Sequence, residues 1–322
     1  MAEATPAGVP ISTTADSSRR FLPYLALAFS VVGLGFSAIF VKWANAPGAV
    51  SGFYRVAIAA AVLALPFSVQ AQRQAPLSKR HIWFAGLGGL FFAGDLAAWS
   101  TAVLITSAAN ATLLANTSPL WVGLGALVLF KEKLGLMFWA GLLLAMLGAV
   151  VIFGEDFFLS QTLGIADGLA LLAGFCYGMF FLATERARGK LSPLVAWWIS
   201  AITSTLALLL ISVTLKQPLV GYPAVTYWNL IAVALVTQVG SYLSLSYALG
   251  HLPASHVAPT LLLQPVLTAI LAVPLLGQPL SAMQMVGGGM VLVGIWLVHS
   301  VPVRAQLRRS AQALVRGRAA GG

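Results

Sequence analysis

Charged residues are scarce in this chain. Only 8% of its 322 residues are charged, whereas 59% are hydrophobic, and the mean hydropathy is +0.92. Soluble domains carry about a quarter charged residues. The composition therefore excludes a soluble globular protein and predicts an integral membrane protein. The net charge of +10 does not indicate nucleic-acid binding, because the basic residues lie between apolar segments rather than on one polar surface.

Several chemical motifs are also missing. The single cysteine, Cys176, excludes an intramolecular disulfide bond. No Gly-rich loop is followed by Lys and Ser/Thr, so we expect any energy to come from gradients rather than from ATP. No catalytic Ser/His/Asp set or metal-ligand cluster stands out, and we predict no cofactor, no metal site and no enzymatic activity. We expect no cleavable signal peptide, because residues 1–20 are polar and the apolar segment after them is long enough to span.

Ten apolar segments follow one another along the chain, each near the length of about 20 residues that a bilayer-spanning helix needs. We predict transmembrane helices at 22–42, 49–70, 82–104, 107–130, 136–154, 163–184, 193–215, 225–248, 254–276 and 281–300. Residues 1–20 are expected to form a disordered cytoplasmic tail and 301–322 a basic cytoplasmic tail. The predicted fold class is an all-α integral membrane protein with ten transmembrane helices.

Lysine and arginine are distributed unevenly between the two sides of these segments. With the N-terminus inside, the inner segments hold 15 of these residues, and the outer loops hold only Lys42 and Lys216. The positive-inside rule then places both termini in the cytoplasm. We expect a multi-pass protein of the plasma (cell inner) membrane, with the bilayer as its lipid partner.

The chain also repeats itself. A shift of 146 positions aligns residues 94–148 with 240–294 without a gap, and the 11 identities include prolines and glycines. The two units, 21–154 and 163–300, hold five predicted helices each. Because five is odd, the second unit must enter the membrane inverted. Inverted repeats are typical of secondary transporters, in which substrate binds near the midplane between repeats that open alternately.

The repeated motifs resemble a known family. They are Ser107–Pro119, which reads SAANATLLANTSP, then Lys131–Leu134, which reads KEKL, and the second copies Pro253–Pro265 and Gly277–Leu280. Together with an arginine early in the second helix, Arg55, they resemble drug/metabolite transporters of the EamA type, which carry two five-helix repeats. The second copy departs from the family pattern in having Gln where the usual acid stands.

This resemblance covers about residues 22–300. It implies export or uptake of small metabolites, often amino acids or related compounds. It also implies a cavity lined by helices one, three, four, six, eight and nine, with the other four helices as scaffold.

Asp95 is the sharpest functional signal, because it is a carboxylate near the centre of the third predicted span. An intramembrane acid is costly and usually marks a substrate or ion path. It is therefore a candidate proton carrier and substrate ligand, and the alternative is a structural hydrogen bond to a neighbouring helix. Trp99 lies four residues on, on the same helical face, where it is a candidate stacking wall. The repeat places Ser241 at the position that corresponds to Asp95.

Polar and aromatic side chains on other predicted helices are further candidates for substrate binding. Gln238 and Tyr242 share one face of the eighth helix with Ser241. This face either lines the cavity or joins neighbouring helices by polar contacts, as is common in membranes. Phe36 and Tyr177, on the first and sixth helices, are candidates for contact with an apolar part of the substrate.

Prolines occur at matching positions of the two repeats. Asn116 precedes Pro119 in the fourth helix, and Gln264 precedes Pro265 in the ninth. Proline removes a backbone hydrogen bond and kinks a helix, which is tolerated in membranes where the freed groups line a cavity. We predict that both prolines act as gating hinges and that Asn116 and Gln264 face the cavity. The alternative is that the kinks only shape the bundle.

Other conspicuous residues have structural interpretations. Arg55 either snorkels outward or attracts an anionic group, and we favour a structural role. Phe53, Trp197 and Trp198 lie near span ends and are expected in the interfacial aromatic belt. His256 either titrates or donates a hydrogen bond. Glycines at helical spacing allow close helix packing, either within a monomer or in a homodimer.

The sequence as a whole predicts a secondary transporter that moves a small organic metabolite, an amino acid or a related compound, by alternating access, and we expect export. Its partners would be the substrate molecule and, in a coupled mechanism, a proton. The first alternative is an uncoupled facilitator of the same substrates. The second is a membrane-embedded enzyme or lipid-handling protein, which would need convergent titratable groups at one membrane face.

Overall fold

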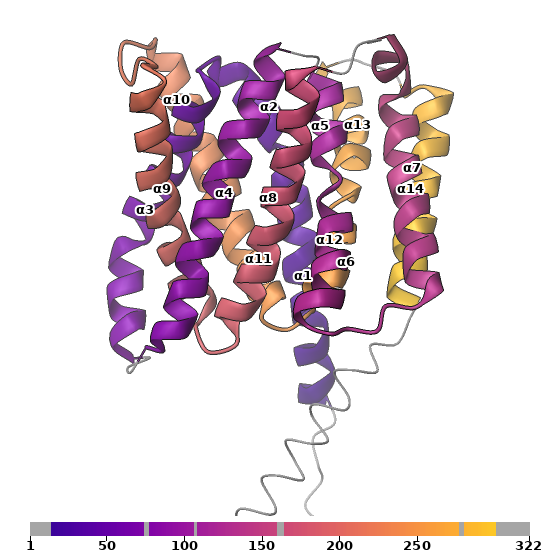
Figure 1. The fold of residues 1–322 in the computed structure, drawn as a ribbon, viewed down its shortest axis with the longest axis horizontal. Coiled ribbons are helices and arrows are strands. Elements are labelled where there is room, and N and C mark those ends of the chain that lie inside the picture. The colour runs from indigo at the N-terminus through magenta and orange to yellow at the C-terminus, as the bar shows by residue number, and fades with distance from the viewer. Residues whose placement is uncertain (1–13, 74–76, 106–107, 160–163, 277–279, 301–322) are drawn as a thin grey trace, which may run out of the picture.

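The computed structural model of the chain describes residues 14–73, 77–105, 108–159, 164–276 and 280–300, and all regular structure in these ranges is helical (Figure 1). The helices are α1 (Thr14–Gly35), α2 (Ser37–Ala44), α3 (Gly48–Arg73), α4 (Lys79–Ile105), α5 (Ala108–Ala115), α6 (Ser118–Leu129), α7 (Leu136–Leu159), α8 (Ile165–Arg188), α9 (Pro193–Thr214), α10 (Ala224–Val233), the π-helix η1 (Ala234–Ser241), α11 (Tyr242–Leu249), α12 (Ala254–Thr260), α13 (Leu263–Leu276) and α14 (Ala282–Ser300).

Each of the ten predicted apolar segments holds one of these helices or a consecutive group of them. In the described ranges, six helical stretches are long and apolar enough to cross a membrane, namely Gly48–Arg73, Lys79–Ala102, Ile165–Arg188, Pro193–Thr214, Ala224–Leu249 and Ala282–Ser300. Three shorter stretches are also apolar, namely Phe21–Gly35, Leu113–Leu129 and Leu136–Ile152.

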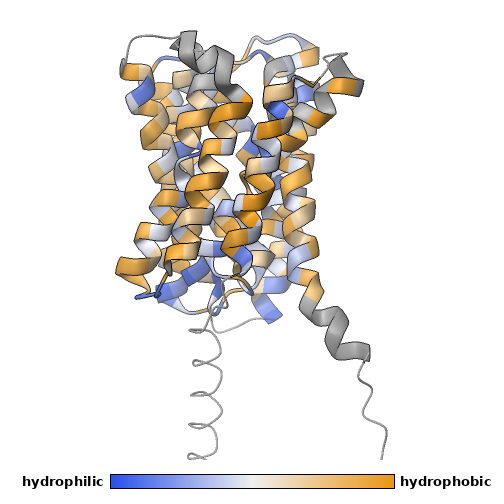
Figure 2. Cartoon of the chain, turned by 90° about the vertical axis from the view of Figure 1, so that its right-hand side faces the viewer, coloured by the Kyte–Doolittle hydropathy of each residue, from blue (hydrophilic) through white to orange (hydrophobic). Residues whose placement is uncertain are grey.

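Large apolar side chains cover the outside of the bundle. Leu65 is 75% exposed, Leu136 is 86% exposed and Trp296 is 67% exposed, whereas Arg55 and Gln238 are buried. Figure 2 shows hydrophobic residues along the length of the helices and hydrophilic residues mostly toward the ends. So much exposed apolar surface is unfavourable in water and favourable in lipid. The chain is a multi-pass membrane protein.

The two halves of the chain run in opposite directions through the bundle. The first turn of α1 and the last turn of α14 lie at one end, which is the bottom of Figure 1 and is called the lower end below. The first half starts at the lower end and finishes with α7 at the upper end, where α8 starts the second half. This opposite direction is the arrangement that five helices per repeat predict.

Helix packing reflects the repeat. α4 packs against α8. The repeat relates α4 to η1 and α11, and it relates α8 to α1. These counterparts also pack together, because α1 contacts both η1 and α11. α3 packs against its own counterpart α9, and α7 against its own counterpart α14. Such paired contacts are expected if a pseudo-twofold axis relates the repeats.

Glycines allow α7 and α14 to cross at very short distance. A Cβ added to Gly148 would lie 2.6 Å from the carbonyl oxygen of Gly287, and one added to Gly141 would lie 2.7 Å from that of Gly294. The 146-residue shift relates Gly141 to Gly287 and Gly148 to Gly294. The repeat therefore relates the two glycine contacts of the crossing to each other. These four glycines are therefore used for packing within one chain.

Adding one methyl group at this crossing should destabilise the protein. In Gly287→Ala the new Cβ meets backbone, and overpacking of this kind costs about 1–3 kcal/mol. The matched control is Gly289→Ala in the same helix, where a Cβ meets nothing within 4 Å. We expect thermal unfolding in detergent to show a lower Tm for Gly287→Ala and an unchanged or slightly higher Tm for Gly289→Ala. Equal melting of the two variants would contradict this packing.

Two helix breaks occur at positions that the repeat relates. The fourth predicted helix is interrupted at residues 116–117, between α5 and α6, and the ninth at 261–262, between α12 and α13. Pro119 lies in the first turn of α6 and Pro265 in the first turn of α13. The predicted kinks are present, because a proline cannot donate to the preceding turn.

Two further irregularities have no counterpart in the other repeat, and the sequence did not predict them. The first helix is interrupted at Phe36, between α1 and α2, although the corresponding α8 is continuous. The eighth contains the π-helix 234–241, although the corresponding α4 is regular. Gln238, Ser241 and Tyr242 are buried, but the wider turn changes the α-helical spacing on which the predicted stripe was based.

The helix α1 starts before the predicted boundary. Residues 14–20, which we expected in the disordered tail, are helical. No glycine or proline lies between residue 14 and the apolar segment, so the helix continues into it without a break. The rest of the predicted N-terminal tail and the basic tail 301–322 lie outside the described residues.

Candidate functional site

A buried arginine occupies the interior of the bundle. Arg55, on the second turn of α3, is only 4% exposed. Its Nη2 donates to Ser37 Oγ at 3.0 Å. With the Gln238 amide oriented so that its oxygen faces the guanidinium, that oxygen accepts from Arg55 Nη2 at 3.1 Å and from Nε at 3.2 Å. Arg55 therefore points inward and does not snorkel to the outer surface.

The break at Phe36 and the π-helix, which have no counterpart in the other repeat, each supply a hydrogen-bond partner of Arg55. Ser37 is the first residue after the break at Phe36, and Gln238 lies inside the π-helix. π-turns are rare and often occur at functional sites. Among the described residues, no partner is found for the third guanidinium nitrogen, Nη1. Hydrogen bonds thus fix the Nε and Nη2 edge of the guanidinium, whereas the N–H groups of Nη1 have no acceptor among the described residues.

Asp95 lies on α4 within electrostatic reach of Arg55, Tyr177 and Tyr242. Its side chain is half-buried. In the described part of the chain, its carboxylate makes no hydrogen bond, so the structural bond that was the alternative for this residue is not found there. One basic and one acidic side chain therefore share the interior, with no direct contact between them among the described residues.

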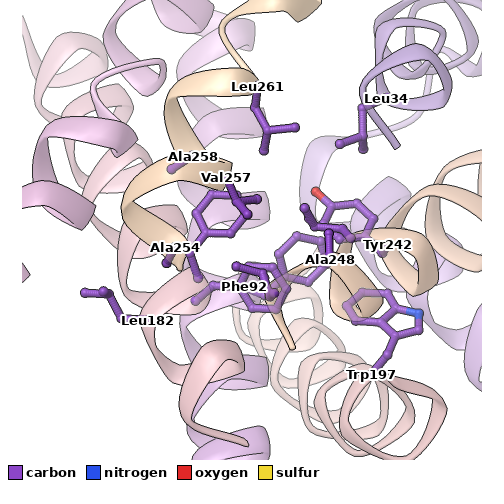
Figure 3. Packing of buried hydrophobic residues seen from close by; sticks show 14 of the residues in the cluster. Leu34, Phe92, Leu182, Trp197, Tyr242, Ala248, Ala254, Val257, Ala258 and Leu261 are labelled. Atoms are coloured by element: carbon purple, nitrogen blue, oxygen red, sulfur yellow. The ribbon is translucent and has the colours of Figure 1, made fainter. Parts of the chain in front are cut away.

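Aromatic rings pack beside these charges. The Tyr242 hydroxyl donates to the Tyr177 hydroxyl at 3.2 Å. The Tyr242 ring stacks on Trp197, with centroids 4.9 Å apart and an interplanar angle of 11°. Phe92 packs edge-on against Tyr242, with ring centroids 4.8 Å apart, and lies tilted against Phe180 at 4.9 Å. Figure 3 shows Phe92 near the centre of this buried cluster.

Three of these rings, Phe92, Phe180 and Trp197, form an aromatic layer on the lower side of Asp95 and Tyr177. α4 rises from the lower end, so Phe92 lies about one turn below Asp95. α8 descends toward the lower end, so Phe180 lies about one turn below Tyr177. All three rings of the layer, Phe92, Phe180 and Trp197, are at most 2% exposed. The charged groups are therefore separated from the lower end by packed side chains.

Four predicted site residues thus come together: Asp95, Tyr177, Gln238 and Tyr242. Their roles in binding stay predictions. Phe36 is half-buried and precedes the serine that holds the arginine.

The other predicted residues do not join this group. Trp99 lies about one turn above Asp95 and is half-buried, without a ring contact in the described ranges. Asn116 lies in the break between α5 and α6, and its Nδ2 is buried without a hydrogen-bond partner among the described residues. Gln264 is half-buried in the first turn of α13. The gating roles of Pro119 and Pro265 also stay predictions.

One aromatic prediction was wrong. Trp197 was expected at the membrane interface but is 1% exposed and stacks inside the bundle. Its neighbour Trp198 is half-buried, stacks on Phe67 at 3.8 Å and donates its Nε1–H to Ala60 O at 2.8 Å. A position near the end of a span says nothing about which helix lies beside it, so no sequence signal separated these tryptophans from belt residues.

The described residues contain no group of three His, Cys, Asp or Glu side chains that could hold a metal ion. The chemistry of the site thus comes from one guanidinium, one carboxylate and several phenol and aromatic rings. Groups of these kinds can bind a small molecule through charge, hydrogen bonds and ring contacts.

Comparison with known proteins identifies the family to which the chain belongs. The sequence pattern of the EamA-like transporter family matches residues 21–154 and 164–300. The chain belongs to the EamA-like transporter family. It is therefore a membrane transport protein of the drug/metabolite transporter superfamily with two EamA repeats.

Individual EamA relatives are distant in sequence. A protein of Salmonella typhimurium named "probable amino-acid metabolite efflux pump" is 31% identical over 202 residues, which are 59% of this chain and 66% of the relative. The uncharacterized transporter YyaM of Bacillus subtilis is 23% identical over 257 residues, which are 78% of this chain and 84% of the relative. One solved crystal structure superposes with a TM-score of 0.71 at 19% identity, over 87% of this chain and 96% of the other, and supports the fold.

Proposed function

We propose that this EamA protein is a secondary transporter that exports a zwitterionic metabolite of the amino-acid class. The observation that carries this proposal is the placement of Arg55 and Asp95 in one interior site without direct contact between them. The name of the Salmonella relative, "probable amino-acid metabolite efflux pump", agrees with this substrate class and direction.

Each end of a zwitterion has a partner in this site. The carboxylate of the substrate would accept hydrogen bonds from the unpartnered Nη1 edge of Arg55, since guanidinium and carboxylate match in charge and planar geometry. The ammonium group would face Asp95. The rings of Tyr177 and Tyr242 would contact an apolar side chain.

The transport cycle that we propose is alternating access. Ten membrane crossings in two inverted five-helix repeats would place the charged site between the repeats. The basic residues Arg80, Lys133 and Arg186 lie in the elements of the lower end, which supports a cytoplasmic lower end and cytoplasmic termini. The plasma membrane is the location that we propose.

Asp95 would also couple transport to protons. A carboxylate that holds either a proton or the substrate ammonium exchanges one for the other, so inward proton flow would drive outward substrate flow. An uncoupled facilitator of the same substrates is the alternative, and it differs from this proposal only in its response to a pH gradient.

The test is transport by the purified protein in liposomes. We would compare an apolar amino acid with its decarboxylated amine and its N-acetyl derivative, each with and without an imposed pH gradient. The proposal expects the amino acid to accumulate only with the gradient, at a rate at least tenfold above both analogues. Equal transport of all three compounds would contradict recognition of a zwitterion, and equilibration without accumulation would favour the facilitator.

A further inference from the structure

The half-helix α12 is held at the lower end by carboxylates from two other elements. The backbone N–H of Ala254, its first residue, donates to Glu185 Oε2 of α8 at 2.8 Å. The next residue, Ser255, donates its hydroxyl to Glu132 Oε2 at 2.8 Å, and Glu132 follows α6 in the first repeat. One contact therefore joins the two repeats, and the other joins two helices of the second repeat.

His299 of α14 contacts α12 at two positions, one of them its last residue. The Thr260 hydroxyl lies 2.8 Å from His299 Nε2 of α14. His256 Nδ1 lies 3.4 Å from His299 Nδ1. Polar contacts at both of its ends therefore fix α12 to its neighbours.

Apolar side chains in and just after α12 belong to the same buried cluster as the aromatic layer described above. Ala254, Val257 and Leu261 belong to the same buried cluster as Phe92 and Leu182 (Figure 3). While α12 keeps this position, packed side chains fill the space between the lower end and the charged site. A displacement of α12 would loosen this packing and so help that site to open toward the lower end.

The contacts that hold α12 border a cavity. A cavity of about 330 Å³ lies at the lower end, and Glu132, Glu185 and Pro253 are among the residues that line it. Hydrogen bonds at the edge of such a cavity can exchange for bonds to water, so they can break and re-form during a transport cycle.

The repeat does not provide equivalent carboxylates at the upper end. The 146-residue shift relates Glu132 to Gln278, Glu185 to Ile39 and Ser255 to Ala109. The repeat relates the lower and upper ends of the bundle, but only the lower end has carboxylates at these positions. A contact present in only one of two conformations shifts the equilibrium toward that conformation.

We propose that Glu132 and Glu185 are gating residues, which latch α12 and keep the lower end closed until both hydrogen bonds break. This inference rests on the proposed alternating-access transport. Neutral side chains at these positions lose the charge-assisted part of the hydrogen bonds. The population with an open lower end then rises.

The single cysteine reports this opening without any substrate. Cys176 is 8% exposed and lies beside the charged site, since a Cβ on Gly94, next to Asp95, would be 3.1 Å from its sulfur. We would measure its reaction with a membrane-impermeant thiol reagent in right-side-out and inside-out vesicles. The double variant Glu132→Gln/Glu185→Gln is expected to react about tenfold faster from the face of the lower end.

The milder variant Ser255→Ala removes one hydroxyl and should raise the rate about threefold. The matched control is Asp167→Asn. Asp167 Oδ2 also accepts a backbone N–H, that of Gly164 at 2.8 Å, but this hydrogen bond lies within the N-terminus of α8. The labelling rate of Asp167→Asn is expected to equal that of the wild type. A second control, Lys133→Cys in a Cys176→Ala background, places a thiol at the lower end, so its labelling shows which membrane face that end occupies.

The inference is overturned if both latch variants, eluting as monodisperse protein, label at the wild-type rate, or if labelling rises only from the upper face. The same variants separate it from the proposed function. Faster labelling in a protein that moves no amino acid overturns the proposed function and supports the latch. Normal transport with unchanged labelling overturns the latch alone.

Discussion

Arg55→Lys is expected to lower amino-acid transport by about tenfold to a hundredfold, which corresponds to the loss of one charge-assisted hydrogen bond of about 1.5–3 kcal/mol. Lysine keeps the positive charge but not the planar fork of the guanidinium. A single ammonium cannot replace the bonds to Ser37 and Gln238 and also keep donors for a substrate carboxylate. The measurement is the initial uptake rate in proteoliposomes over a range of substrate concentrations, which gives KM and the maximal rate separately.

The matched control for this experiment is Arg73→Lys. Arg73 ends the same helix, α3, but is exposed at the lower end of the bundle, so its replacement should leave transport unchanged. A purely structural Arg55 would lower the Tm of the variant and leave KM unaltered in the protein that remains folded. Unchanged KM and maximal rate in folded Arg55→Lys would refute carboxylate recognition by this residue.

Asp95→Asn is expected to abolish accumulation driven by a pH gradient. In the wild type, acidifying the substrate side protonates the carboxylate, so the substrate ammonium loses its partner and apparent affinity falls. Asparagine is neutral at every pH, so the variant should bind with an affinity that pH no longer changes and that is at least about tenfold lower. Uptake at several pH values, with and without a gradient, measures both effects.

The substrate analogues make this prediction sharper. Asp95→Asn should transport an amino acid no better than its N-acetyl derivative, because the residue that distinguishes an ammonium group is gone. Asp167→Asn, which removes a carboxylate at a helix N-terminus, should keep the discrimination and the response to the gradient. Transport by Asp95→Asn that stayed fully pH-dependent would exclude this residue as the proton carrier.

Much of the helical scaffold was readable from local features. Apolar stretches of sufficient length must form helices in lipid, because unpaired backbone groups are too costly there. The 146-residue repeat predicted the matched breaks before Pro119 and Pro265, since proline interrupts a helix wherever it occurs. It also predicted related glycines, and these proved to form the α7–α14 crossing.

The site was only partly readable. Asp95, Tyr177, Gln238 and Tyr242 stood out as polar or aromatic groups in apolar segments, and they do lie together. Which side chains complete the group depended on neighbours that are distant in the chain. Trp197 illustrates the point, because a tryptophan near a span end packs inward only if another helix covers it.

The sequence by itself determined that this chain is helical and apolar on its outside, and that it is built as two related halves, because these properties follow from composition, segment length and the repeat. Only the tertiary structure decided the direction of Arg55, the break at Phe36 and the π-turn at Gln238. The physical reason is that irregular turns and a buried charge are unfavourable in isolation. They persist where side chains from other helices satisfy them, and sequence neighbours do not reveal those partners.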